Sequence, residues 1–218
     1  SVFTAILLPI DLRGNELVLE ERKLMKIAFS TKNIYQIERF SKKYKVKNFK
    51  KINFSNLNGS ELRMIRLELL NKINSIPISL ILAQSIIESG WGASRFAQEG
   101  NALFGQWTWS GEGLKPKDAD ESEGHKVMKF NVLQASVRAY QRNLNTHKSY
   151  KEFRFVRAQL RDAGKELDSI ILSRYLDEYA ETGQKYVKIL QKIIEQNQLK
   201  DFDKAKLLPS SLELESLI

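Results

Sequence analysis

The stretch ISLILAQSIIE, residues 78 to 88, constrains the fold more than any other, because it is apolar around nearly its whole helical circumference. Pro77 before it is typical of a helix start, and Gly90 after it is typical of a helix end. A helix without a polar face must be covered by other elements on every side. The sequence therefore predicts a domain built around this helix, with one acid, Glu88, in its last turn.

Helical periodicity also dominates the rest of the 218 residues, of which 42% are hydrophobic, enough for a sizeable core. The exception is the region from 100 to 130, where FGQWTW and HKVMKF flank a polar segment and predict a β-hairpin. The fold class is therefore predicted to be mainly α (α+β). Further helices are expected at about 16–29, 33–44, 61–73 with Ser60 as its cap, 131–144, 150–162, 168–180 and 184–197.

Changes in composition along the chain predict three parts. Residues 1–58 are expected to form an N-terminal helical annex that ends in a basic linker. Residues 59–199 are expected to form the catalytic domain, and residues 200–218 a C-terminal tail. The basic stretch 42–51 is typical of a solvated surface, although it could also contact an anionic wall polymer or lipid.

Composition excludes several kinds of chemistry. The chain has no cysteine and only two histidines, so we expect neither a metal site nor a cofactor, and carboxylates become the default acids. A net charge of +9 favours a polyanionic partner, which could be nucleic acid, anionic lipid or an acidic wall polymer. No stretch approaches the roughly 18 to 20 apolar residues that span a bilayer. The opening residues SVFTAILLPI lack the charged n-region and cleavage site of an intact signal peptide.

Glu88 is the candidate catalytic acid. Burial disfavours the carboxylate, and so does the partial negative charge at a helix C-terminus, so both effects should raise its pKa towards neutrality. A general acid needs a pKa raised in this way, so that it carries a proton at neutral pH. The alternative is an exposed acid at the end of a helix, which is the commoner fate of a glutamate.

Aromatic and amide side chains follow Glu88 closely in sequence. Aromatic rings pack against the C–H faces of sugar rings, and amides bind hydroxyl and acetamido groups, so this cluster predicts a glycan site. The alternative for each tryptophan is ordinary packing, which the sequence favours for Trp91. The candidate substrate-binding residues are Trp91, Asn101, Phe104, Gln106, Trp107 and Trp109.

The region from about Ile78 to Leu199 resembles the bacterial peptidoglycan glucosaminidase family, which includes flagellar-rod hydrolases and autolysins. It is most similar to the Bax-like proteins of Gram-negative bacteria. The motifs that carry the resemblance are ESGWG, LFGQW, SVRAYQRNLNTHKSY and YAETGQKYVKIL.

The resemblance implies a lysozyme-like helical domain with a β-hairpin over a substrate groove, cleaving β-1,4 glycosidic bonds next to N-acetylglucosamine. Glu88 would be the proton donor. Family members carry a second glutamate on the hairpin, for which Glu121 is the best match and Glu123 the next. Ala102 stands where the family often has asparagine, and Asn101 lies one position earlier.

The family's tyrosine motif matches Tyr179 and Tyr186, with one extra residue between them. Tyr179 is a candidate for stabilising positive charge in the reaction, and Tyr186 for binding substrate. His125, beside the acidic tip of the hairpin, could bind to that tip, and His125 and Glu123 are also candidates for binding substrate. The second half of the reaction could use Glu121 as base, the acetamido group of the substrate as nucleophile, or Tyr179.

The expected function is therefore a peptidoglycan hydrolase with Glu88 as general acid. A lytic transglycosylase, or a glycan- or partner-binding module whose catalytic site has decayed, are the alternatives. The expected partner is the peptidoglycan glycan strand, with no nucleic acid and a monomeric protein. The expected location is the periplasm or cell envelope, with the export signal, and any membrane contact, supplied by a segment outside this chain.

Overall fold

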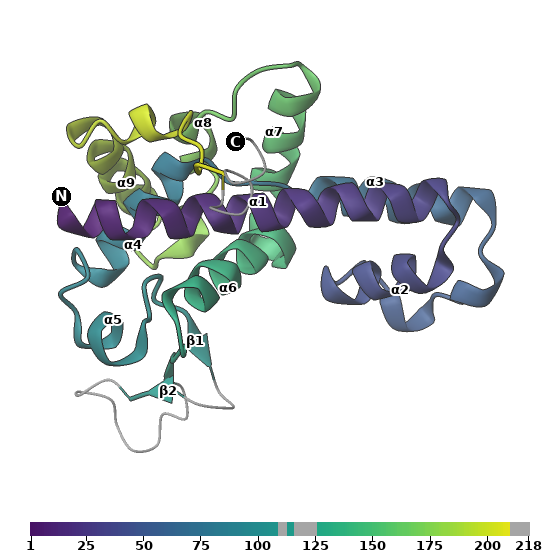
Figure 1. The fold of residues 1–218 in the computed structure, drawn as a ribbon, viewed down its shortest axis with the longest axis horizontal. Helices are drawn as coiled ribbons and strands as arrows, with labels where there is room; N and C mark the ends of the chain where they lie inside the picture. Colours follow the sequence, from purple (N-terminus) through teal and green to yellow (C-terminus); the bar gives the residue numbers. More distant parts are fainter. Residues whose placement is uncertain (109–112, 116–125, 210–218) are drawn as a thin grey trace, which may run out of the picture.

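The structure is a computed structural model that describes residues 1–108, 113–115 and 126–209. Helices dominate it, together with a small antiparallel sheet, so the predicted mainly α, lysozyme-like fold is confirmed (Figure 1). Within the described ranges, no helix is both long and apolar enough to cross a membrane.

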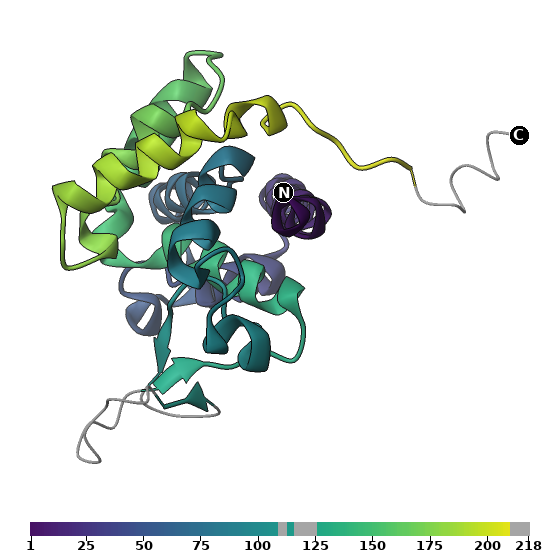
Figure 2. The ribbon, with the colours of Figure 1, turned by 90° about the vertical axis from the view of Figure 1, so that its left-hand side faces the viewer.

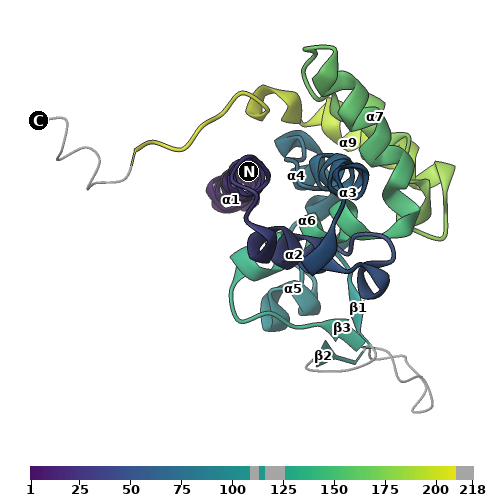
Figure 3. The same ribbon diagram turned by 90° about the vertical axis from the view of Figure 1, so that its right-hand side faces the viewer.

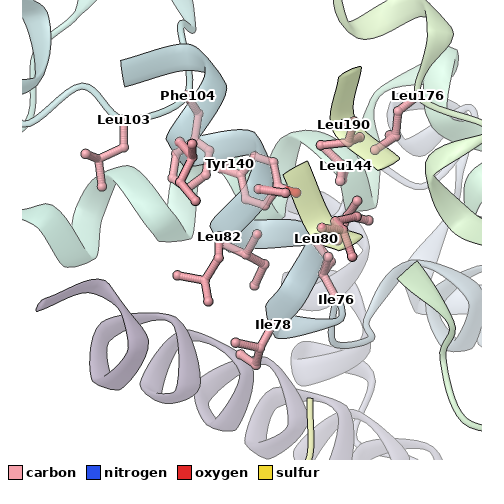
Figure 4. Close-up of a cluster of buried hydrophobic side chains, with 14 of the residues drawn as sticks. Ile76, Ile78, Leu80, Leu82, Leu103, Phe104, Tyr140, Leu144, Leu176 and Leu190 are labelled. Atoms are coloured by element: carbon pink, nitrogen blue, oxygen red, sulfur yellow. The ribbon is translucent and has the colours of Figure 1, made fainter. Parts of the chain in front are cut away.

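The apolar helix α4 (Ile78–Ser89) lies at the centre of the main hydrophobic core, as predicted. Its residues from Ile78 to Ile86 are all buried. Core side chains of α6 (Leu133–Thr146) and α9 (Gln184–Gln196), among them Tyr140, Leu144 and Leu190, lie around it (Figure 4). The helix begins one residue after Pro77 and ends at Gly90, whose φ of 57° lies in the left-handed region that favours glycine. The last turn of this helix is therefore held firmly in the middle of the molecule.

Helix α1 (Val2–Ser30) is much longer than the predicted helix at 16–29. Ser1 caps it, and Pro9 is accommodated inside it. A Cβ on Gly14 would lie 3.0 Å from the side chain of Val137, so this glycine lets α1 approach α6 closely. The sequence did not predict the first half of this helix, because Pro9 and Gly14 both have low helix propensity.

A second core lies at the other end of α1, where α1 packs against α2 (Ile34–Lys43) and α3 (Gly59–Lys72) (Figure 1). The short 3-10 helices Phe49–Lys51 and Phe54–Asn56 connect α2 with α3. Asn58 rather than Ser60 caps α3, because its side chain and that of Glu61 form a capping box. The division at residue 58 stays a prediction; α1 contributes side chains to both cores.

Three strands form the sheet, in the order β1 (Trp107–Thr108), β3 (Lys126–Met128), β2 (Gly113–Leu114). β1 and β3 pair antiparallel with Trp107 opposite Val127, which confirms the predicted pairing of the two alternating runs. A short helix not predicted from the sequence, α5 (Arg95–Gly100), connects α4 to this sheet. Figures 2 and 3 show α5 and the sheet on one side of α4, and α7 and α9 on the other.

The remaining helices are α6 (Leu133–Thr146), α7 (Lys151–Asp162), α8 (Ser169–Ser173) and α9 (Gln184–Gln196), with 3-10 turns at Lys148–Tyr150, Asp177–Tyr179 and Leu199–Phe202. The helix predicted at 168–180 is therefore wrong in length. The carbonyl of Ile170 accepts hydrogen bonds from Ser173 Oγ (2.7 Å) and Gln191 Nε2 (3.3 Å), which compete with the helical ladder.

Candidate active site

Glu88 lies in the last turn of α4, where its side chain is partly buried. Burial raises the pKa of its carboxyl from 4.5 to about 7, and hydrogen bonding to Tyr186 offsets part of this rise. A substantial fraction of Glu88 is therefore protonated at neutral pH, which a general acid requires.

A chain of buried hydrogen bonds supports Glu88 from behind. The hydroxyl of Tyr140 donates to Gln84 Oε1 (2.5 Å), and Gln84 Nε2 donates to the Tyr186 hydroxyl oxygen (2.9 Å). Because Gln84 occupies this oxygen as a donor, the proton of Tyr186 is free to be donated to Glu88. Gln84 lies four residues before Glu88, one helical turn away on the same face of α4.

Gly105 packs against the carboxyl group of Glu88. A Cβ at this position would lie 2.8 Å from Glu88 Oε2, and the backbone has a φ of 61°, in the left-handed region. Glycine is therefore needed at position 105 for two reasons: the backbone has a left-handed conformation, and the carboxyl group of Glu88 occupies the space that a side chain would fill.

An open groove of about 750 Å³ passes in front of Glu88. One wall is a stripe of α6 at helical spacing, formed by Ala139, Arg142, Asn143 and Thr146. The lining is completed by Lys45, Phe104, Gly105, Gln106, Trp107, Met128, His147, Tyr150, Tyr179, Ala180 and Glu181.

Four predicted site residues lie in this groove with Glu88. Trp107 is 47% exposed, and Phe104 is buried against Tyr140, with ring centroids 4.1 Å apart. Gln106 donates from Nε2 to the carbonyl of Ala139 (3.4 Å), whereas its Oε1 has no partner among the described residues. The hydroxyl of Tyr179 donates to the carbonyl of Phe104 (2.8 Å), and burial raises the pKa of Tyr179 well above its usual value.

Three predicted residues lie elsewhere. Trp91 is 41% exposed rather than part of the core; it packs edge-on against Phe3, outside the groove. Asn101 ends α5 and donates to the carbonyl of Phe130 (2.9 Å), so its amide is already engaged. Tyr186 is only 3% exposed, does not line the groove, and hydrogen-bonds to Glu88 from the interior; its role in substrate binding stays a prediction. Trp109, Glu121, Glu123 and His125 lie outside the described residues.

Several groove residues were not predicted. Glu181 directly follows the Tyr-Ala pair of the tyrosine motif, so its position in that motif was the available signal. The sequence marked Lys45 only as part of the basic stretch 42–51, and Arg142 only as part of a family motif. Their place in the groove depends on how α6 and the annex pack. Within the described part of the chain, no group of three or more His, Cys, Asp or Glu side chains could hold a metal ion.

Comparison with known proteins identifies the family of this chain. The model of the glucosaminidase family, described as mannosyl-glycoprotein endo-beta-N-acetylglucosaminidase, matches residues 66–199, more than half of the chain. The chain belongs to the glucosaminidase family. The family segment contains Glu88 and its supporting tyrosines, and it begins after the end of the annex, residues 1–58.

A curated relative is similar over a longer segment. Protein bax of Escherichia coli (strain K12) is 32% identical over 163 residues, which cover 75% of this chain and 55% of that protein. The chain thus spans about half the length of this Bax relative. No solved structure gives a significant match.

Proposed function

We propose that this protein is a peptidoglycan hydrolase that cleaves β-1,4 glycosidic bonds next to N-acetylglucosamine, with Glu88 as general acid. The observation that carries the proposal is the position of Glu88, a partly buried carboxyl with a pKa of about 7 at the wall of an open groove. Family membership supports the class of substrate.

In the first step, the protonated carboxyl of Glu88 donates its proton to the glycosidic oxygen as the bond to the anomeric carbon breaks. Burial favours the protonated form that this step needs, and Tyr186 stabilises the carboxylate that remains. The Tyr140–Gln84–Tyr186 chain keeps the carboxyl in one orientation, because each of its hydrogen bonds fixes the donor of the next.

The second step must stabilise the positive charge at the anomeric carbon and deliver water. Tyr179 stays neutral because its pKa is raised, so it contributes the dipole of its hydroxyl and not an anionic nucleophile. The acetamido group of the substrate and Glu121 are the other candidates that the sequence suggested. Glu181 adds a fourth, since it is a second carboxylate in the groove.

Substrate would bind along the α6 stripe, with a sugar face against the exposed ring of Trp107. We propose that the protein acts as a monomer in the cell envelope, on glycan strands.

Product analysis tests the proposal. Purified protein is incubated with peptidoglycan, and the released fragments are identified by mass spectrometry before and after borohydride reduction. We expect fragments that end in reducing N-acetylglucosamine. Products that end in an anhydro sugar would instead establish a lytic transglycosylase, and strands that are bound but never cut would establish a binding module.

A further inference from the structure

The annex contributes a residue to the groove. Lys45 follows α2 and lines the groove together with Glu88, although it lies outside the segment that matches the glucosaminidase family. The catalytic segment therefore does not form this end of the groove by itself.

The backbone of Lys45 is held rigidly. Its carbonyl accepts a hydrogen bond from Lys72 Nζ (2.6 Å), and Lys72, itself buried, forms an ion pair with Glu68 (2.7 Å). Glu68 also accepts from the backbone N–H of Lys47 (2.9 Å), and the side chain of Val46 is buried in the second core. The exposed side chain of Lys45 thus extends from a fixed frame.

The surface around Lys45 is strongly basic. Residues 42–51 contain six lysines and no acid. Lys43 forms an ion pair with Glu21 (2.8 Å), but the other five lysines form no ion pair within the described ranges. Their charges are therefore available to a ligand.

A second hollow lies beside the groove on this surface. It has a volume of about 360 Å³, and Lys45 lines both it and the groove. Its other lining residues are Lys42, Val46, Asn48, Phe49, Lys50 and Lys51. Apolar side chains and a rim of ammonium groups suit a short acidic peptide with aliphatic side chains better than an uncharged sugar.

Arg142 of α6 lines the same groove as Lys45. Along α6 the groove stripe runs from Ala139 to Thr146, roughly 10 Å at 1.5 Å per residue. This length corresponds to about two sugar rings, so a side chain on one sugar near Glu88 can reach the annex.

We propose that Lys45 and Arg142, with the lysine-rimmed hollow beside them, form a subsite for the carboxylates of the acidic peptide side chains that peptidoglycan carries. The inference rests on the proposed function of the groove and adds a preference for strands that still bear their peptides. Continuity with the groove favours this ligand over a lipid headgroup, which would need a flat membrane-facing surface and no connection to Glu88.

The test compares two substrates, glycan strands with their peptides and strands stripped of peptides by an amidase. For Lys45→Gln/Arg142→Gln we expect KM for peptide-bearing strands to rise about 3- to 10-fold, the effect of losing two exposed charge contacts, with kcat unchanged. KM for stripped strands should rise by a smaller factor, because Arg142 also lines the groove in which the glycan itself would bind. Added salt should reduce the difference between wild type and variant. Lys192→Gln, which removes an exposed lysine of α9 away from the groove, is the matched control and should match wild type.

The outcomes separate this inference from the proposed function. If wild type cuts neither substrate, the proposed function itself fails. If wild type cuts both and the double variant changes their KM values equally or not at all, the peptide subsite is wrong. Loss of binding to phosphatidylglycerol vesicles in the double variant, with KM for peptide-bearing strands unchanged, would assign the lysines to a membrane surface instead.

Discussion

At the scale of single residues, Gly105 controls the space available to the carboxyl of Glu88. Gly105→Ala would place a methyl group 2.8 Å from Glu88 Oε2, so the acid must move. We expect kcat to fall at least 10-fold, because a displacement of about 1 Å at a reacting group is costly. Steady-state kinetics on peptidoglycan fragments measures this.

Gly164→Ala is a matched control for this change. Gly164 also has a left-handed φ, 67°, but a Cβ there would meet nothing within 4 Å. Both substitutions should cost about 1 kcal/mol of stability from backbone strain, whereas only the change at Gly105 should cost activity. Equal activity in the two variants would show that Glu88 does not need the space beside Gly105.

Tyr186 adjusts the pKa of Glu88, which burial raises to about 7. As a general acid with a pKa of about 7, Glu88 should lose activity as the pH rises through that value. The hydrogen bond from Tyr186 lowers this pKa, so Tyr186→Phe should raise it and move the alkaline limb of kcat/KM to higher pH. A pH–rate profile of the variant measures the shift.

The control is Tyr140→Phe, which breaks the bond to Gln84 Oε1 without touching Glu88. Each change leaves one buried Gln84 atom unpaired, so both should cost about 1 to 3 kcal/mol of stability. Only Tyr186→Phe should shift the profile strongly. An unshifted pH–rate profile in Tyr186→Phe would show that the hydroxyl of Tyr186 does not influence the pKa of Glu88.

At the scale of elements, α1 carries an acid into the main core. Asp11 is fully buried, and neither of its carboxyl oxygens has a partner among the described residues. Burial raises the pKa of Asp11 well above its usual value, so the folded state favours the protonated form. The free energy of unfolding should therefore fall as the pH rises from the unfolded-state pKa through the folded-state pKa.

Asp11→Asn removes the charge with little change of shape. We expect it to raise the free energy of unfolding at pH 8 by on the order of 1 to 3 kcal/mol, and to change it little at pH 4. Urea unfolding at both pH values measures this, with the exposed Asp201→Asn as control. A variant that is equally destabilised at both values would mean that Asp11 has an unseen partner.

The elements also show what periodicity can and cannot predict. Helix α4 was predicted correctly because an apolar circumference has one physical solution, burial on all sides. The first half of α1 was missed because Pro9 and Gly14 weaken an isolated helix, whereas here packing against α6 outweighs local propensity.

At the scale of the whole molecule, the groove combines residues from distant parts of the chain. Glu88, Phe104, Gln106, Trp107 and Tyr179 were predictable, since the motifs that contain them point to a glycan site. The supporting role of Tyr186 depends on how α9 packs against α4, and the contribution of Lys45 depends on how the annex docks. The tyrosine motif and the basic stretch 42–51 marked these residues in the sequence, but their positions relative to Glu88 and the groove follow only from the structure.

Glu88→Gln tests the central claim most directly, because it keeps shape and hydrogen bonding but removes the transferable proton. Turnover of peptidoglycan fragments should fall by on the order of 10² to 10⁴, the usual contribution of acid–base catalysis, with binding nearly kept. The free energy of unfolding should hold or rise, since a neutral amide avoids the cost of a partly buried carboxylate. A folded Glu88→Gln protein that cleaves the glycan at near wild-type rate would contradict the assignment.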